Sequence, residues 1–481
     1  MSLTPHELYG QFILHKNGAP VPEGWNASSF EGWTLAAHPR LPAHAIRLDG
    51  RHVGWLIGYA AGSNGALVDR AIDLPSLDQL ESFIYGFGGR FACAIVSPQL
   101  ARLYMDPCGS LAAVYAVDRS MVGSTSTLLS LGNPSYLARK LAQPTLPANQ
   151  FYPAGISGDP EFARLLPNHY LDLNSWKPVR HWPTELAARD ESQIAANVAS
   201  VADHLRSTIT AVAKRYHCYM GLTAGRDSRM VLAAARDAID RFTFVTFRYK
   251  PGGYNKEKVV DLHIARKLSS KLGLMHIELD LRDPPREMKD EFQIRTGFAG
   301  HWGRVVDHYD AVSALDMSGV WLTGYAGEVG RAFYWGWGED LKKSLTAEEL
   351  LRRMHLQESR ENLAATNRWL DSFPESVRRD YFALLDLLYI EQRLGCWASP
   401  AMYGGAPFAF TLTPFNHRGI FTAMMSLPSE YRARQELAAD VVKHSWPAAM
   451  SYPFQQYTGL SALGKRVKEK LARLRKRIAR P

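Results

Sequence analysis

One stretch, residues 218–236, constrains the fold more than any other part of the chain. It opens with apolar residues at 218–222, continues with small residues at 223–225, and ends in strong helix formers. We expect a short buried strand, a tight turn, and a helix that begins near Asp227 and Ser228. Small residues at such a turn let backbone N–H groups approach an anion, and the helix N-terminus adds a partial positive charge at the same point.

Asp227 brings a carboxylate to the mouth of this anion site. A carboxylate beside a phosphate is favourable when a divalent cation lies between them. The stretch is not a Walker P-loop, because no Gly-Lys-Ser/Thr follows the turn. A plain strand-turn-helix, with Asp227 or Ser228 as the N-cap residue, is the structural alternative.

The turn resembles the Ser-Gly-Gly-x-Asp-Ser pyrophosphate loop of N-type ATP pyrophosphatases, in the form found in the asparagine synthetase family. Thr replaces the first Ser and Ala replaces the first Gly. The resemblance implies that Asp227 is catalytic and binds Mg²⁺. It also implies an ATP-binding set in and next to the turn, which comprises Leu222, Thr223, Ala224, Gly225, Arg226, Asp227 and Ser228.

Further strands and helices alternate on both sides of this motif. We expect helices over 190–216 and 256–272, and strands over 242–247, 276–279 and 320–322. This alternation predicts an α/β fold with a doubly wound parallel sheet, in which ligands bind beyond the carboxyl ends of the strands. The resemblance places adenosine along the strand at 242–247, with Thr246 as a cofactor-binding residue.

A second glycine-rich motif occupies residues 319–331. A short strand leads into a turn that holds Gly324, Glu328 and Arg331. It is similar to the family's Gly-x-Gly-x-Asp-Glu-x-x-Gly-Gly motif, although Gly327 stands where the family has Asp. The resemblance implies that Gly324 contacts the cofactor, that Glu328 is catalytic and binds Mg²⁺ with Asp227, and that Arg331 is catalytic. A helix-capping role for Glu328 is the structural alternative.

Residues 1–133 read mainly as short strands bounded by turn residues. They resemble the class II glutamine amidotransferase (Ntn) β-sandwich domain that precedes the synthetase domain in this family. That glutaminase needs Cys directly after the initiator Met, with its α-amine as the base. Here Ser2 stands at that position and the first cysteine is Cys93. We therefore expect a degenerate domain without glutaminase activity, joined through a linker and hairpin arm at 134–190.

The synthetase-like domain is expected over 191–460, with a helical C-terminal half that includes helices over 341–370 and 377–394. In the family, a lysine on a C-terminal loop stabilises the pyrophosphate leaving group. The corresponding loop here is 451–456, which contains no lysine, and Lys443 and Lys465 are the nearest substitutes.

Charge and cysteine content limit the classes of partner. The net charge is +9, and nine basic residues and one acidic residue lie between Lys465 and Arg480, so the rest of the chain is close to neutral. Residues 461–481 are therefore predicted to form a separate basic amphipathic tail. Its possible binding partners are an anionic membrane surface, RNA or an acidic protein. The four cysteines are scattered, which argues against zinc. No apolar run is long enough to span a membrane, and we expect a cytoplasmic protein.

Taken together, the resemblance implies an ATP-dependent ligase that adenylates a small-molecule or peptide carboxylate and releases pyrophosphate. Ammonia or an amine of the substrate then forms the amide, as in the related β-lactam synthetases and lasso-peptide cyclases. A nucleotide-binding scaffold or sensor on the same fold is the alternative. An RNA-modifying adenylating enzyme is a further alternative, and only the basic charge of the tail favours it. A homodimer is left open.

Overall fold

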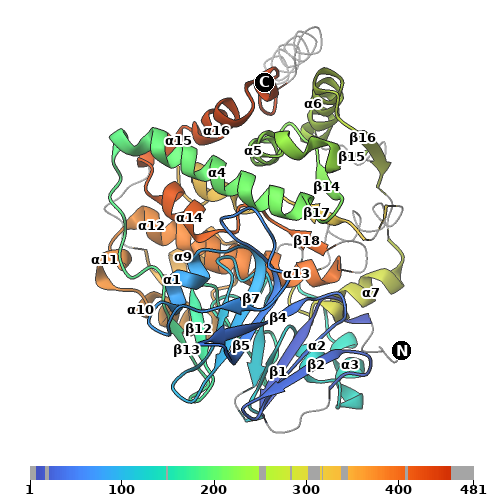
Figure 1. Cartoon of the computed structure of the whole chain (residues 1–481), viewed down its shortest axis with the longest axis vertical. Coiled ribbons are helices and arrows are strands. Elements are labelled where there is room, and N and C mark those ends of the chain that lie inside the picture. Colours follow the sequence, from blue (N-terminus) through green and yellow to red (C-terminus); the bar gives the residue numbers. More distant parts are fainter. Residues whose placement is uncertain are drawn as a thin grey trace, which may run out of the picture.

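The computed structural model places a layered β region at one end of the molecule and helices around a parallel sheet at the other (Figure 1). No helix among the described residues is long and apolar enough to cross a membrane. The predicted basic tail, Ser2 and Lys465 lie outside the described residues. The structure describes residues 7–16, 21–116, 118–147, 150–248, 256–281, 284–301, 315–316, 318–336, 345–406 and 410–456.

Two sheets form the N-terminal region, and most of their strands pair antiparallel. One has the order β11-β9-β10-β1-β3-β2, and it consists of β1 (Phe12–Lys16), β2 (Asn26–Phe30), β3 (Trp33–Ala37), β9 (Val114–Ala116), β10 (Met121–Gly123) and β11 (Ala163–Arg164). The other has the order β13-β12-β8-β7-β5-β4-β6, and it consists of β4 (Ala43–Leu48), β5 (Arg51–Ala61), β6 (Ile72–Asp73), β7 (Gly88–Val96), β8 (Ala101–Met105), β12 (His169–Asp172) and β13 (Lys177–Arg180).

Side chains that alternate between the two faces of each strand form the layers of this region. On β5, Trp55 and Ile57 enter the core between the two sheets, whereas Leu56 points to the outer face. Helix α1 (Leu80–Tyr85) covers that outer face. Helices α2 (Ser126–Leu129) and α3 (Pro134–Leu141) cover the outer face of the other sheet. The region is therefore a sandwich of two sheets with helices on both outer faces.

Strands β12 and β13 pair antiparallel and form a hairpin within residues 134–190, where a hairpin arm was expected. It is part of the sandwich, because β12 also pairs with β8. The short strand β11 pairs with β9 in the other sheet. The residues after 134 thus add strands to both sheets.

A parallel sheet forms the centre of the C-terminal region. Its order is β16-β15-β14-β17-β18, with every neighbouring pair parallel. The chain starts at β14, adds strands on one side, and then continues on the other side with β17. The strand order therefore reverses between β14 and β17, and such a point creates a crevice at the carboxyl ends of the strands. The strands are β14 (Cys218–Gly221), β15 (Phe242–Arg248), β16 (His276–Asp280), β17 (Val320–Leu322) and β18 (Phe410–Leu412).

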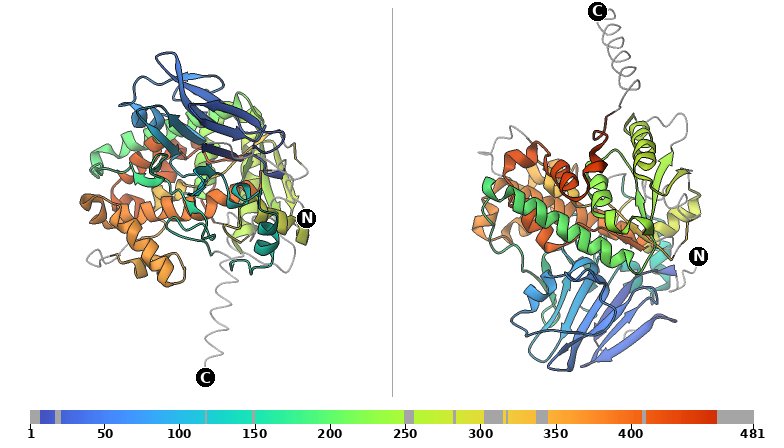
Figure 2. Two further views of the ribbon diagram at one scale, coloured as in Figure 1. Left: turned by 90° about the horizontal axis from the view of Figure 1, so that it is seen from below. Right: turned by 45° about the horizontal axis from the view of Figure 1, so that its top comes forward.

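Helix α4 (Ile194–Ala213) connects the two regions. One part of it packs on β5 and β7 of the sandwich, and it also packs on α5 (Arg226–Ala234), α14 (Arg418–Met425) and α16 (Leu437–Ser445). The right-hand view of Figure 2 shows the sandwich below this long green helix. Its apolar stripe explains the position, because Val201, Leu205 and Ile209 are fully buried.

The remaining helices differ from the expected ones at two places. The apolar spacing predicted one helix over 341–370. Among the described residues, α9 ends before His355, which has a φ of 57°, and Ser359 caps a new helix, α10. The helix predicted over 377–394 is also divided: α11 ends at Arg378, Asp380 caps α12, and residues 388–398 form the π-helix η5. The other elements are α6 (Lys256–Leu272), α7 (Arg286–Arg295), α9 (Ala347–Arg353), α10 (Arg360–Asp371), α11 (Glu375–Arg378), α12 (Tyr381–Leu387), η5 (Leu388–Ala398), α13 (Ser399–Gly404) and α15 (Ser429–Ala433), with the 3₁₀ helices η2 (Glu191–Gln193), η3 (Arg236–Arg241), η4 (Gly327–Arg331) and η6 (Pro447–Met450).

Buried polar groups join the sandwich to the helical half. Asn416 follows β18 and donates from its amide to the Asp106 carboxylate at 2.7 Å. Its amide oxygen accepts from the backbone N–H of Cys108 at 2.9 Å. Burial raises the pKa of Asp106, and the hydrogen bonds from Ser110, Asn416 and Leu111 oppose that rise. Fully satisfied contacts of this kind fix one relative position of two layers.

Candidate functional site

The loop after β14 has the conformation that its small residues predict. Helix α5 begins at Arg226, and Gly225 is its N-cap residue, with no side chain capping the first turn. Asp227 and Ser228 therefore lie in the first turn and are not caps. The hydroxyls of Thr223 and Ser228 are 2.7 Å apart, and the Thr223 hydroxyl accepts from the backbone N–H of Gly225 at 3.0 Å. This geometry closes a compact loop at the positive end of a helix dipole.

Distant residues hold the loop in place. The backbone N–H of Ala224 donates to Asp261 of α6 at 2.8 Å, and its carbonyl accepts from the N–H of Gln455 at 2.9 Å. Leu222 is buried, and its carbonyl accepts from the Thr246 hydroxyl at 2.8 Å. The hydroxyl of Thr246 is also 2.8 Å from His276. The side chain of this predicted cofactor-binding residue therefore contacts the neighbouring strand β16 and the residue that follows β14.

The turn after β17 lies directly against this loop. A Cβ atom built on Gly324 would lie 3.1 Å from the Cβ atom of Asp227, and one on Gly327 would lie 2.8 Å from an Asp227 carboxylate oxygen. A Cβ atom at Gly327 would force the Asp227 carboxylate to shift, and one at Gly324 would make a tight contact, so glycine at both positions favours the close approach of the two segments. Where the resembled motif carries Asp, this chain has Gly327, and the space beside it holds the carboxylate of Asp227.

Two alanines in the left-handed region bracket the 3₁₀ helix η4. Ala326 has a φ of 74° and Ala332 a φ of 58°. Such a conformation costs about 1 kcal/mol or more for a residue other than glycine and persists only where the surroundings fix it. Arg432 provides one of these contacts: it donates to the carbonyl of Val329 and pairs with buried Asp386 at 2.6 Å. The turn is thus held in a single strained shape.

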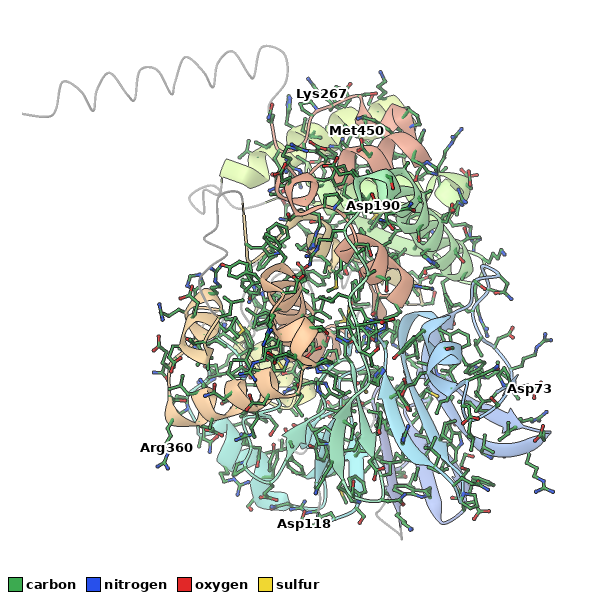
Figure 3. All side chains as sticks on the ribbon, turned by 90° about the vertical axis from the view of Figure 1, so that its left-hand side faces the viewer. Asp73, Asp118, Asp190, Lys267, Arg360 and Met450 are labelled. Atoms are coloured by element: carbon green, nitrogen blue, oxygen red, sulfur yellow. The ribbon has the colours of Figure 1, made fainter. Side chains whose placement is uncertain are left out.

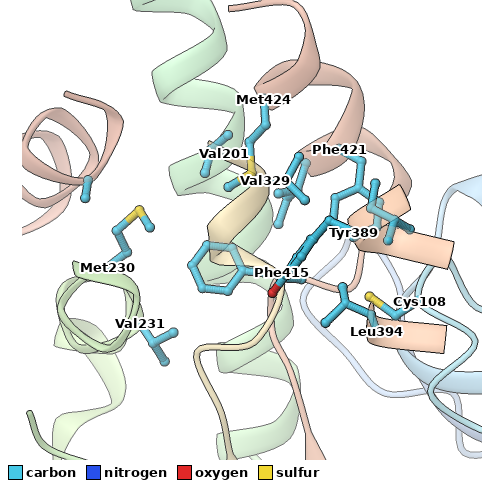
Figure 4. Close-up of a cluster of buried hydrophobic side chains, with 14 of the residues drawn as sticks. Cys108, Val201, Met230, Val231, Val329, Tyr389, Leu394, Phe415, Phe421 and Met424 are labelled. Carbon is cyan, nitrogen blue, oxygen red and sulfur yellow. The ribbon is translucent and has the colours of Figure 1, made fainter. Parts of the chain in front are cut away.

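Three charged groups meet where the two loops touch. Arg331 reaches Asp227 at 3.0 Å and Glu328 at 3.3 Å through the same guanidinium nitrogen. Tyr389 donates its hydroxyl hydrogen to Glu328 at 2.7 Å. Figure 4 shows Tyr389 among apolar side chains of the helical half, including Val329 and Phe415. We call Asp227 and Glu328 the carboxylate pair.

The pKa values of the carboxylate pair depend on burial and on the single cation, Arg331, that contacts both carboxylates. Burial, together with the charge of Asp227, raises the pKa of Glu328 to about 7. Burial also raises the pKa of Asp227, although Arg331 opposes the rise. For Arg331, burial lowers the pKa, but the carboxylate pair outweighs it and the pKa is raised. Glu328 is therefore poised to exchange a proton near neutral pH.

The two carboxylates are the kind of oxygen donor that Mg²⁺ takes. Both carboxylates approach one guanidinium nitrogen, which marks a common location for positive charge. Magnesium commonly takes one or two carboxylates and completes its shell with phosphate oxygens and water. In the part of the chain that the structure describes, no group of three or more His, Cys, Asp or Glu residues is arranged to hold a metal. A magnesium ion here would have to displace or share the position of Arg331.

The C-terminal segment 449–456 covers the loop from a third side. Arg229 of α5 is 1% exposed and donates to the carbonyls of Ala449 and Tyr452 at 2.9 and 3.0 Å. Arg226 donates to the side chain of Gln455 at 3.1 Å. Figure 3 shows Lys267 of α6 and Met450 on the same side of the molecule. The segment contains no lysine, and Lys443 lies on the surface, paired with Asp440.

The predicted site residues from both motifs come together at one place. Residues 222–228 and the turn with Gly324, Glu328 and Arg331 meet at the carboxyl ends of β14 and β17. Sequence reasoning missed Asp261, Tyr389 and Gln455, which contact the loop or the carboxylate pair from far along the chain. No local pattern marks these three residues.

Comparisons with known proteins add no assignment. A scan against protein-family models finds no match to this chain, and a search of curated protein sequences finds none either.

Proposed function

We propose that this protein is an ATP-dependent amide-forming ligase that adenylates a carboxylate and releases pyrophosphate. One observation carries the proposal. At the point where the strand order of the parallel sheet reverses, two glycine-containing loops place Asp227, Glu328 and Arg331 against the N-terminus of α5. Crevices at such points bind nucleotides and related ligands in open parallel sheets.

In this proposal the loop at 223–228 binds the pyrophosphate part of ATP. The hydroxyls of Thr223 and Ser228 and the first N–H groups of α5 supply neutral donors. Arg226 and Arg331 supply positive charge as the pyrophosphate leaves. Mg²⁺, held by the carboxylate pair, would neutralise charge on the phosphate oxygens when it is bound.

The reaction has two steps. A substrate carboxylate oxygen attacks the α-phosphorus of ATP, and the bond from that phosphorus to the pyrophosphate oxygen breaks. An amine nitrogen then attacks the acyl carbon, AMP leaves with the bridging oxygen, and an amide results. The attacking amine loses a proton to the surrounding water. Because Ser2 replaces the glutaminase cysteine, ammonia or an amine of the substrate is the nucleophile.

A nucleotide-binding scaffold or sensor is a second candidate function. Two features favour it: segment 449–456 has no lysine at the loop, and Arg331 already pairs with both members of the carboxylate pair. Both features lower the expected rate of pyrophosphate release more than the affinity for ATP.

Release of AMP separates the two functions. Purified full-length protein is incubated with MgATP, pooled carboxylic acids and hydroxylamine as a general nucleophile. Asp227→Asn is the test variant, and Asp203→Asn is the matched control, because Asp203 lies exposed on α4 and pairs with Arg206. AMP formation that is lost only in Asp227→Asn supports the ligase. ATP binding without AMP formation supports the scaffold, and the absence of both refutes the nucleotide assignment.

A further inference from the structure

Aromatic side chains continue outward from the carboxylate pair. The ring of Phe333 lies 4.7 Å from that of Tyr389, whose hydroxyl contacts Glu328. The ring of Tyr334 packs edge-on against Phe333 at 4.9 Å. Phe333 is 42% exposed, an unusual exposure for a large apolar ring. A surface for a flat apolar group therefore begins directly beside the candidate site.

The π-helix η5 places a cation at this surface. Tyr389, Arg393 and Trp397 are spaced four residues apart, so they share one face of a wide helix whose hydrogen bonds run from i to i+5. The guanidinium of Arg393 lies 3.7 Å from the ring centroid of Trp397. π-Helical turns are frequent at functional sites. The face that holds Tyr389 at Glu328 thus also presents Arg393.

Arg393 and Glu391, the two charged residues of η5, differ in their pairing. Within the described residues, no carboxylate forms an ion pair with Arg393, and its side chain is half-buried. On another face of the same helix, Glu391 is fully buried and takes two hydrogen bonds from Arg180, at 2.6 and 2.8 Å. Half-buried cations usually obtain such a partner, because leaving the charge unpaired is costly.

The positive charge of Arg393 acts on the residues that flank the carboxylate pair. Burial raises the pKa of Tyr334 to about 12, and Arg393 opposes the rise. Burial and the charge of Glu328 raise the pKa of Tyr325, and Arg393 opposes that rise too. Arg331, and not Arg393, pairs directly with Glu328. Arg393 is therefore a second cation near the carboxylate pair, in addition to Arg331.

We propose that this surface is a substrate subsite, which binds an aromatic body and a second anionic group, distinct from the carboxylate that is adenylated. Arg393 binds the anionic group, since a guanidinium stacked on an indole ring offers a planar fork to a carboxylate. The rings hold the aromatic body. This proposal rests on the proposed ligase function and narrows its substrate to an aromatic dicarboxylic acid. The aromatic part of the subsite consists of Tyr325, Phe333, Tyr334 and Trp397, and the buried ring of Tyr389 supports Phe333.

Binding of three matched acids tests the subsite. Phenylsuccinate carries both features, phenylacetate lacks the second carboxylate, and succinate lacks the ring. Each is titrated calorimetrically into the full chain, with and without MgATP. We expect phenylsuccinate to bind at least tenfold more tightly than the other two. Arg393→Gln should weaken phenylsuccinate binding roughly tenfold to hundredfold and leave phenylacetate unchanged, while Arg393→Lys retains part of the affinity.

Two further variants make the result specific. Phe333→Ala should weaken phenylsuccinate and phenylacetate alike and leave succinate unchanged. Arg368→Gln, an exposed change on α10, should alter none of the three. Equal binding of the three acids, no binding of any, or full phenylsuccinate affinity in Arg393→Gln refutes the subsite. If MgATP still binds in those samples, the subsite fails alone; if MgATP does not bind, the proposed function fails with it.

Discussion

Replacing Glu328 with Gln should make the protein less sensitive to alkaline pH. The folded protein raises the pKa of Glu328 from 4.5 to about 7, so the folded state holds this proton more tightly than the unfolded state does. The stabilising effect of the proton is complete below pH 4.5 and is lost as the pH rises through 7. A glutamine carries no titrating proton and keeps an oxygen that can accept from Tyr389.

The magnitude follows from the shift. A change of about 2.5 pKa units corresponds to roughly 3 kcal/mol, and only 16% of the Glu328 side chain is exposed, so solvent screening is small. Between pH 5 and pH 8, the unfolding free energy of Glu328→Gln should therefore rise by roughly 2–3 kcal/mol relative to that of the unmodified protein. Asp227 shares Arg331 with Glu328, and it keeps that ion pair in the variant.

Urea unfolding at pH 5, 6, 7 and 8 measures this difference, provided that the dependence on urea is the same for both proteins. Glu375→Gln is the matched control, because Glu375 lies exposed on α11 in a surface pair with Arg379. Surface pairs contribute little, so the control difference should stay within about 0.5 kcal/mol at every pH. A difference for Glu328→Gln that does not change between pH 5 and pH 8 would refute the argument.

Three other predictions concern the surroundings of the site. Arg432→Met should destabilise the protein by about 3–5 kcal/mol in urea unfolding, because it leaves buried Asp386 without its cation; a loss below about 1 kcal/mol contradicts this. Binding of Mg²⁺ and pyrophosphate should release close to one proton at pH 6.5, since the metal requires an ionised carboxylate pair; calorimetry in buffers of different ionisation enthalpy counts it, and a count of zero is the contrary result. Arg229→Met should speed amide hydrogen exchange across 449–456 more than elsewhere, and unchanged protection there would show that Arg229 does not tether the segment.

The local sequence predicts that the two loops lie at one edge of the sheet, whereas the pairing of Asp227 with Glu328 was expected only from the resemblance. Each glycine-containing turn follows a short apolar strand, at 218–221 and at 320–322, and carboxyl ends of parallel strands share one edge of a sheet. Glycine at position 327 also has a physical reason, because the carboxylate of Asp227 occupies the adjacent space. Here the local sequence pattern and the global fold agree, so the positions of the two strands and their turns could be predicted from short segments.

Other features depend on contacts that no local pattern encodes. Asp261 and Gln455 hold Ala224 from 37 and 231 residues away. The apolar spacing over 341–370 continues through the break at His355, so periodicity alone could not reveal it, although Ser359 is a residue type that caps helices. The π-helix that carries Tyr389 and Arg393 follows from packing and not from propensity.

The most direct test of the central claim is calorimetric binding of MgATP to two glycine variants. Gly327→Ala places a Cβ 2.8 Å from a carboxylate oxygen of Asp227, whereas Gly336→Ala meets no atom within 4 Å. If the nucleotide binds where the two loops touch, Gly327→Ala should lose at least tenfold in affinity and Gly336→Ala should match the unmodified protein. Equal affinity in all three proteins, with normal thermal unfolding, would contradict the claim that loops 223–228 and 323–331 form one nucleotide site.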